Sequence, residues 1–143
     1  MSAINFFCED VAFELKNEKK IKTWLSKTIQ AYDLSLDPDQ DLNYIFCSDQ
    51  YLHQMNVDYL QHDTLTDVIT FDNSEDEEQI AGDIFISIDR IQENAQNFGV
   101  NFEQELHRVI VHGLLHLIGF GDKTEQEAQM MRTKENEHLS LLQ

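Results

Sequence analysis

Residues 102–118 constrain the fold most, because apolar side chains at helical spacing cover nearly the whole circumference of the helix that they predict. The positions that form this apolar surface are Phe102, Leu106, Val109, Ile110, Gly113, Leu114, Leu115, Leu117 and Ile118. A helix on the surface of a globular protein is apolar on one side only. We therefore expect a central helix with the rest of the chain packed around it.

Two histidines on this helix predict a metal site. His112 and His116 stand four residues apart, so their side chains project from one helix face about 6 Å apart along the axis. Gly119 is placed to end the helix, and Gly121 allows the chain to bend back and bring Asp122 to the same point. Two imidazoles, a carboxylate and an open fourth position are typical of a catalytic metal site. The alternative is a pair of hydrogen-bonded core histidines, because short motifs recur by chance.

The spacing differs from that of zinc peptidases. Their H-E-x-x-H motif places a glutamate general base directly after the first histidine, whereas this chain has Gly113 there. Glycine cannot transfer a proton, so a metallopeptidase is the less favoured interpretation. A glycine inside a helix costs about 1 kcal/mol relative to alanine, which indicates that another part of the chain packs very close to this position.

The run from His112 to Asp122 resembles the H-G-x-L-H-L-x-G-Y-D-H signature of the YbeY family, bacterial metal-dependent endoribonucleases linked to ribosomal RNA maturation and ribosome quality control. Residues 66–71, Thr-Asp-Val-Ile-Thr-Phe, and residues 82–87, Gly-Asp-Ile-Phe-Ile-Ser, are similar to the two strand motifs that precede the metal helix in that family. The resemblance therefore spans residues 42–122, well over half of the chain.

The resemblance implies one divalent metal ion, expected to be zinc, with nickel or another transition metal as alternatives, bound by His112, His116 and Asp122. The chain departs from the signature with Phe120 for tyrosine, Gly121 for aspartate and Asp122 for the usual third histidine. Because aspartate is itself a good ligand for zinc and for harder divalent ions, this last change alters the site without abolishing it.

A further departure affects the expected catalytic residues. Family members commonly carry an arginine shortly before the first strand motif, and this chain has Leu60 at that place. Leucine cannot bind a phosphate, so we expect another cation to replace the arginine, and Arg108, one turn before His112, is the candidate catalytic residue. If no cation replaces it, weaker nuclease activity is expected. Asp83 and Glu105 are candidates for the general base by location only.

The formal net charge of −17 argues against a broad nucleic-acid-binding surface, because phosphate contacts from lysine and arginine dominate such binding. A bound metal supplies positive charge locally. Half of the ten basic residues fall in one segment, namely Lys16, Lys19, Lys20, Lys22 and Lys27. We interpret this segment as a solvated helix face, and the alternative is a surface that faces a phosphate backbone or an acidic partner.

The length of 143 residues and the hydrophobic content of 41% predict one domain over residues 1–143. Cys8 and Cys47 lie in apolar runs and form no C-x-x-C motif, so we expect two buried thiols in a reducing compartment. The start of the chain lacks a signal-peptide pattern, and no stretch approaches 18 consecutive apolar residues. The sequence thus predicts a cytoplasmic protein without membrane contact.

Periodicity and turn residues predict an α+β fold. Strands are expected at residues 4–8, 42–47, 64–71 and 82–88, and helices at 20–32, 49–60, 89–98, 102–118 and from 124 to the C-terminus. The expected helix N-caps are Asn17, Ser48, Asp89, Asn101 with Gln104, and Thr124 with Glu127. Together with the family resemblance, this layout implies a small mixed four-stranded sheet and about five helices around the central metal-bearing helix.

Two functions of different class follow. The first is a metal-dependent endoribonuclease that cuts single-stranded RNA in ribosomal RNA maturation and ribosome quality control. The second is a ribosome-associated assembly or binding factor with a structural or vestigial metal, which the missing arginine and the acidic surface favour. A metal with an open coordination position indicates the enzyme, and a closed or absent one indicates the binding factor.

Overall fold

The computed structural model describes residues 3–60 and 66–142, and its centre is a mixed four-stranded sheet. The strand order is β1 (Ile4–Glu9), β3 (Leu42–Cys47), β6 (Gly82–Ser87) and β4 (Val68–Asp72). The first three strands are parallel to one another, and β4 pairs antiparallel to β6. The mixed four-stranded sheet implied by the resemblance is therefore confirmed.

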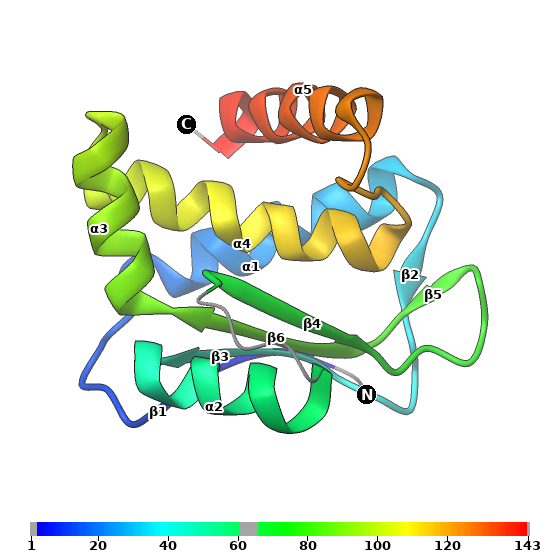
Figure 1. The fold of residues 1–143 in the computed structure, drawn as a ribbon. Helices are drawn as coiled ribbons and strands as arrows, with labels where there is room; N and C mark the ends of the chain where they lie inside the picture. Colours follow the sequence, from blue (N-terminus) through cyan, green and yellow to red (C-terminus); the bar gives the residue numbers. More distant parts are fainter. Residues whose placement is uncertain (1–2, 61–65, 143) are drawn as a thin grey trace.

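Within the described residues, five helices pack around the sheet, in the layers that Figure 1 shows. Their bounds are α1 (Glu18–Ala31), α2 (Asp49–Leu60), α3 (Ile88–Phe98), α4 (Phe102–Ile118) and α5 (Glu125–Leu142). Helices α1 and α4 cover one face of the sheet, α5 lies over α4, and α2 lies on the opposite face. Helix α4 is thus enclosed between the sheet and α5, as its apolar circumference predicted.

The buried core lies between α4 and the sheet. Ile84 and Ile86 of β6 are fully buried against Leu106, Ile110 and the neighbouring leucines of α4. Tyr44 of β3 donates a hydrogen bond from its hydroxyl to the Ile110 carbonyl at 2.9 Å. Close packing and this buried hydrogen bond fix α4 in position relative to the strands.

Most of the expected helix termini are confirmed. Asn101 and Gln104 form a reciprocal capping box, and Thr124 and Glu127 form another. Ser48 accepts a hydrogen bond from the amide of Tyr51. Each of these caps is a local interaction between residues three apart, which explains why the sequence alone could predict it.

Two expected caps are wrong. Asn17 occupies the N-cap position of α1 in a left-handed conformation, and its side chain makes no capping hydrogen bond. Helix α3 is capped by Ser87 and not by Asp89, since the Ser87 hydroxyl oxygen accepts the Arg90 amide. Ser87 is the last residue of β6, so the strand leads directly into the helix.

The remaining differences concern elements and burial that the sequence did not indicate. Strands β2 (Ser35–Leu36) and β5 (Gln79–Ile80) pair in a small second sheet. Of the two cysteines, Cys47 is buried as expected, but Cys8 is exposed because it lies near the end of the edge strand β1. The strand expected from residue 64 begins at Val68, and residues 64 and 65 lie outside the described residues. Among the helices in residues 3–60 and 66–142, none combines the length and apolarity needed to cross a membrane.

Candidate metal centre

Three side chains converge beside the C-terminal end of α4. The Nε2 atoms of His112 and His116 lie 3.0 Å apart. One carboxylate oxygen of Asp122, Oδ2, lies 3.5 Å from the first of these nitrogens and 3.3 Å from the second. The predicted ligands therefore come together, and among the described residues they form the one group of this kind that could hold a metal ion.

The other ring nitrogen of each histidine is held by a hydrogen-bond acceptor. His116 Nδ1 lies 2.9 Å from the carbonyl oxygen of Phe120, and His112 Nδ1 lies 2.6 Å from Glu135 Oε2. A carbonyl oxygen can only accept, so His116 carries its hydrogen on Nδ1. The same tautomer follows for His112 opposite a carboxylate, and it directs the Nε2 lone pairs of both rings toward Asp122.

This arrangement requires a positive charge at its centre, because two lone pairs and a carboxylate repel one another at such distances. Tetrahedral zinc with bonds of 2.0–2.1 Å separates its ligand atoms by about 3.3 Å, and the three observed separations are 3.0, 3.3 and 3.5 Å. Both the donor set and the spacing therefore fit one divalent ion.

The hydrogen bond between His112 and Glu135 shifts the pKa of both side chains. Burial alone would lower the pKa of His112, but the hydrogen bond to Glu135 and the charges of Glu135, Asp67 and Asp122 outweigh it and raise that pKa. Burial likewise opposes ionisation of Glu135, but hydrogen bonds from His112 and Arg108 hold its pKa below the ordinary value. The raised pKa of His112 means that a proton competes with a metal ion for this imidazole, so metal binding should weaken as the pH falls.

The exit from α4 brings Asp122 to the histidines. Gly119 ends the helix with a φ of 126°, a conformation that side chains other than glycine rarely adopt. A Cβ on Gly121 would lie 2.8 Å from a carboxylate oxygen of Glu127, the residue that closes the capping box of α5. The turn between α4 and α5 is therefore tight, and Asp122 lies within it.

Gly113 confirms the expectation of close packing. A Cβ at this position would lie 2.7 Å from Cγ2 of Ile84, well inside van der Waals contact. The absent side chain allows α4 to approach β6 at the level of the metal ligands, and this is the reason for a glycine between the two histidines.

Arg108 lies behind the metal ligands. Its guanidinium donates to Glu135 Oε1 at 2.9 Å and to Asn136 Oδ1 at 3.0 Å. Glu135 is buried on α5, and its other oxygen contacts His112. Arg108 therefore acts on the metal site through Glu135, and its expected role toward the substrate stays a prediction.

A cavity of about 590 Å³ opens over the ligands. Its lining residues are Asn56, Leu60, Thr66, Asp67, Val68, Ile69, Thr70, His112, His116, Asp122 and Lys123. Leu60, which stands at the place of the family's arginine, is on this wall and is 42% exposed. Asp122 is also exposed, so one side of the cluster is open to a fourth ligand, as in catalytic rather than closed structural metal sites.

The sequence reasoning missed two carboxylates at this site. Asp67, directly before β4, lines the cavity, and burial raises its pKa although the charge of His112 opposes the effect. The signal for Asp67 was an acid at the start of a strand motif. Glu135 was indicated by its spacing from Met131, His138 and Leu142, which places a carboxylate on the buried face of α5.

The two expected general-base candidates lie elsewhere. Asp83 accepts hydrogen bonds from the amides of Asn43 and Asn73, and it points to the face of the sheet opposite Ile84. Glu105 is buried beside Arg108 in a neighbouring cavity. Neither residue lines the metal cavity, because alternation along β6 and the helical turn of α4 direct both side chains away from it.

A family model described as Endoribonuclease YbeY matches residues 5–143. The chain belongs to the YbeY family. The endoribonuclease YbeY of Cytophaga hutchinsonii is 54% identical over 96% of this chain and 94% of the relative. That of Flavobacterium johnsoniae is 47% identical over 96% of each chain. The match extends the resemblance from residues 42–122 to almost the full length.

A solved structure agrees with the YbeY fold described above. The solution structure of TM1509 from Thermotoga maritima superposes with a TM-score of 0.63 and is 28% identical, covering 99% of this chain and 89% of that chain. The α+β fold is therefore shared along the chain. Asp122 stands at the place of the third histidine in the YbeY signature. Its carboxylate lies beside the imidazoles of His112 and His116.

Proposed function

We propose that this YbeY-family chain is a metal-dependent endoribonuclease that cuts single-stranded RNA in the cytoplasm during ribosomal RNA maturation and ribosome quality control. Its relatives are endoribonucleases by name. We propose zinc as the ion, because two imidazoles and one carboxylate at these distances suit tetrahedral zinc better than the oxygen-only sites of magnesium or calcium. Ribosomal RNA implies contact with the ribosome or with ribosome-associated proteins.

One observation carries this proposal. Two imidazole nitrogens and one carboxylate oxygen converge at an open cavity, which is lined by residues of α2, β4, α4 and the segments before β4 and after α4. When bound, a divalent ion there would polarise a phosphate oxygen or lower the pKa of a water molecule. The open side favours the enzyme over a structural or vestigial metal.

The residues of the chain have distinct roles in this proposal. Glu135 and the Phe120 carbonyl orient the two imidazoles. Asp67 is the proposed general base, since it lines the same cavity and its raised pKa makes it a better proton acceptor than an ordinary carboxylate. Lys123, beside Asp122, is the cation of this cavity that can contact a phosphate.

Removing either imidazole should remove the metal and the activity together. We expect the His112→Ala and His116→Ala proteins to show the circular dichroism spectrum of the folded wild type. Elemental analysis should find less than one metal ion per chain, and a labelled single-stranded RNA should stay uncut. His53→Ala is the control, because it removes an imidazole that lines neither the metal cavity nor the cavity beside Arg108. Stoichiometric metal in a double His112→Ala, His116→Ala variant would refute the ligand assignment.

Asp67→Asn tests the proposed base. The amide cannot accept the proton, so we expect kcat to fall about 10²- to 10⁴-fold with the metal retained. Asp83→Asn makes the same change on the opposite face of the sheet and should leave kcat unchanged. Equal activity of the Asp67→Asn variant and the wild-type protein would remove Asp67 from the reaction.

A further inference from the structure

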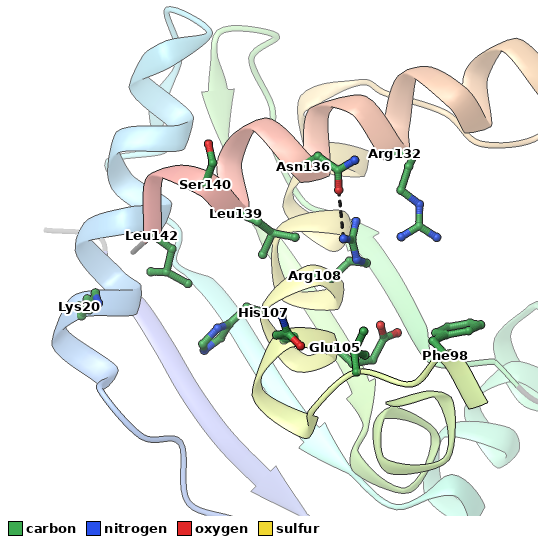
Figure 2. Close-up of a pocket in the computed structure, with 12 residues that line it drawn as sticks. Lys20, Phe98, Glu105, His107, Arg108, Arg132, Asn136, Leu139, Ser140 and Leu142 are labelled. Atoms are coloured by element: carbon green, nitrogen blue, oxygen red, sulfur yellow. Dashed lines mark hydrogen bonds between the residues drawn. The ribbon is translucent and has the colours of Figure 1, made fainter. Parts of the chain in front are cut away.

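A second cavity of about 690 Å³ lies between the end of α3, the first half of α4 and the second half of α5 (Figure 2). Apolar side chains, Phe98, Leu139 and Leu142 among them, form part of its wall. Three cations, Lys20, Arg108 and Arg132, also line it. This cavity is separate from the one that contains the metal ligands.

The residues that line this cavity carry more positive than negative charge, although the whole molecule is acidic. The chain has 27 acidic and ten basic residues, yet the described residues that line this cavity include three of those cations and one carboxylate, Glu105. Gln104, Asn136 and Ser140 add neutral polar groups. A cavity of this composition in so acidic a protein is suited to an anionic ligand.

Arg132 is the cation available to such a ligand. Its side chain is 58% exposed, and the acid paired with it, Glu135, lies at 3.8 Å, too far for a hydrogen bond. Arg108, by contrast, already donates to Glu135 and Asn136 at 2.9 and 3.0 Å. An anion can therefore bind Arg132 without breaking an existing hydrogen bond, whereas an anion at Arg108 would compete with Glu135 and Asn136.

Phe98 provides an aromatic surface in the same cavity. It is 61% exposed at the end of α3, although burying such a ring would be favourable. Figure 2 shows Phe98 and Arg132 on the same side of the view, with Arg132 above Phe98, and both line the cavity. A cation beside an exposed ring is the combination that proteins use for a phosphate and its stacked base.

Glu135 lies between the residues of the two cavities. One oxygen of Glu135 contacts Arg108 in this cavity and the other contacts His112 in the metal cavity. Burial, and then the charge of Asp67 on the metal-cavity wall, raise the pKa of Glu105. The second cavity and the metal centre therefore lie close to one another, on either side of one buried carboxylate.

We propose that this second cavity is a nucleotide subsite that binds the RNA substrate beyond the bond that is cut, with Arg132 on a phosphate and Phe98 stacked on a base. The proposal rests on the proposed function, because the ligand is the same single-stranded RNA. An acidic peptide would also pair with the cations, but neither the exposed ring of Phe98 nor the nearby metal centre would contribute to binding it.

The test compares short and long RNA. Fluorescence anisotropy of the metal-loaded protein with labelled 2′-O-methyl oligoribonucleotides of about three and about ten nucleotides measures Kd, and labelled RNA of both lengths measures cleavage. We expect Arg132→Gln and Phe98→Leu to weaken binding of the long oligonucleotide about five- to tenfold and to leave the short one unchanged. Arg132→Gln should also reduce the slope of log Kd against log salt by about one, whereas Phe98→Leu should not.

Lys134→Gln is the matched control, because it removes one positive charge from the same helix outside the cavity, where Lys134 pairs with Glu137. It should change Kd less than twofold.

If Arg132→Gln and Lys134→Gln behave alike at both lengths, the subsite is wrong even when the wild-type protein cleaves RNA. If the wild type cleaves no RNA but Arg132→Gln and Phe98→Leu still weaken only the long oligonucleotide, the proposed function fails and the subsite stands. Binding of polyglutamate but not RNA, lost in Arg132→Gln, would assign the cavity to an acidic peptide and overturn the proposal.

Discussion

His112 and His116 bind the same centre but are held by acceptors of different kinds. The Phe120 carbonyl that accepts from His116 belongs to the turn after α4, and its position follows from the helix end. The carboxylate that accepts from His112 comes from α5 and is itself held by Arg108. A carboxylate partner makes an imidazole a stronger donor to a metal, so Glu135 gives His112 a greater share of the metal affinity.

Glu135→Gln tests this pairing. The amide retains the size of the side chain but loses the charge that favours metal binding at His112. We expect metal affinity to fall about 10- to 100-fold, measured by competition with a chelator of known affinity, with kcat of the fully metal-loaded protein changed less. Glu137→Gln, an exposed change on the same helix, is the control. Unchanged affinity in the Glu135→Gln protein would mean that the hydrogen bond to His112 only fixes the ring orientation.

At the scale of elements, α4 combines a high content of buried leucine and isoleucine with a glycine at its middle. The glycine is explained by the strand that crosses beneath it, since Ile84 occupies the space that a Cβ would need. The helix therefore gives up local helix propensity for a closer approach to β6. This approach sets the height of the two histidines above the sheet.

Gly113→Ala should destabilise the protein although alanine is the better helix former. The gain in propensity is about 1 kcal/mol, while forcing a methyl group to within 2.7 Å of Ile84 Cγ2 costs about 1–3 kcal/mol through displacement of the helix. We expect a net loss of about 1 kcal/mol in the free energy of unfolding by urea denaturation, together with weaker metal binding. A more stable Gly113→Ala protein would show that α4 and β6 separate at no cost.

For the whole molecule, α5 is docked on α1 through one histidine. Trp24 Nε1 donates to the carbonyl of His138 at 2.8 Å, and the Tyr32 hydroxyl lies 2.7 Å from His138 Nε2. His138 is buried. Because Glu135 lies one turn earlier on α5, this docking also positions the carboxylate that holds His112.

The stability of this interface should depend on pH. Burial, and to a smaller extent the charge of Lys134, lower the pKa of His138 below 6.5, although Glu137 opposes the shift. The unfolded chain therefore binds a proton at this residue more readily than the folded protein, and the contribution to stability is present above about pH 6.5 and is lost as the pH falls through the folded pKa. We expect the difference in unfolding free energy between wild type and His138→Gln to shrink from about pH 7.5 to pH 5 in urea titrations. A constant difference over that range would mean that His138 does not titrate with unfolding.

The sequence by itself determined the features that depend on neighbouring residues. The spacing of His112 and His116 follows from the turn of one helix, and the two capping boxes follow from contacts between residues three apart. The apolar circumference of residues 102–118 predicted a central helix, and the family signature implied the mixed sheet. These features were predictable because local geometry and hydrophobic period specify them without reference to the rest of the chain.

Only the tertiary structure decided which distant groups meet this helix. Glu135 reaches His112 from 23 residues away, and Asp67 reaches the cavity from the position directly before β4. Ser87 instead of Asp89 caps α3 because β6 ends at that serine. Arg108 lies one turn before His112, and its guanidinium is bound to a carboxylate that no local pattern connects to it. On an isolated helix, the side chains of Arg108 and His112 would have no fixed partner. Packing of α5 against α4 gives both of them the same partner, Glu135.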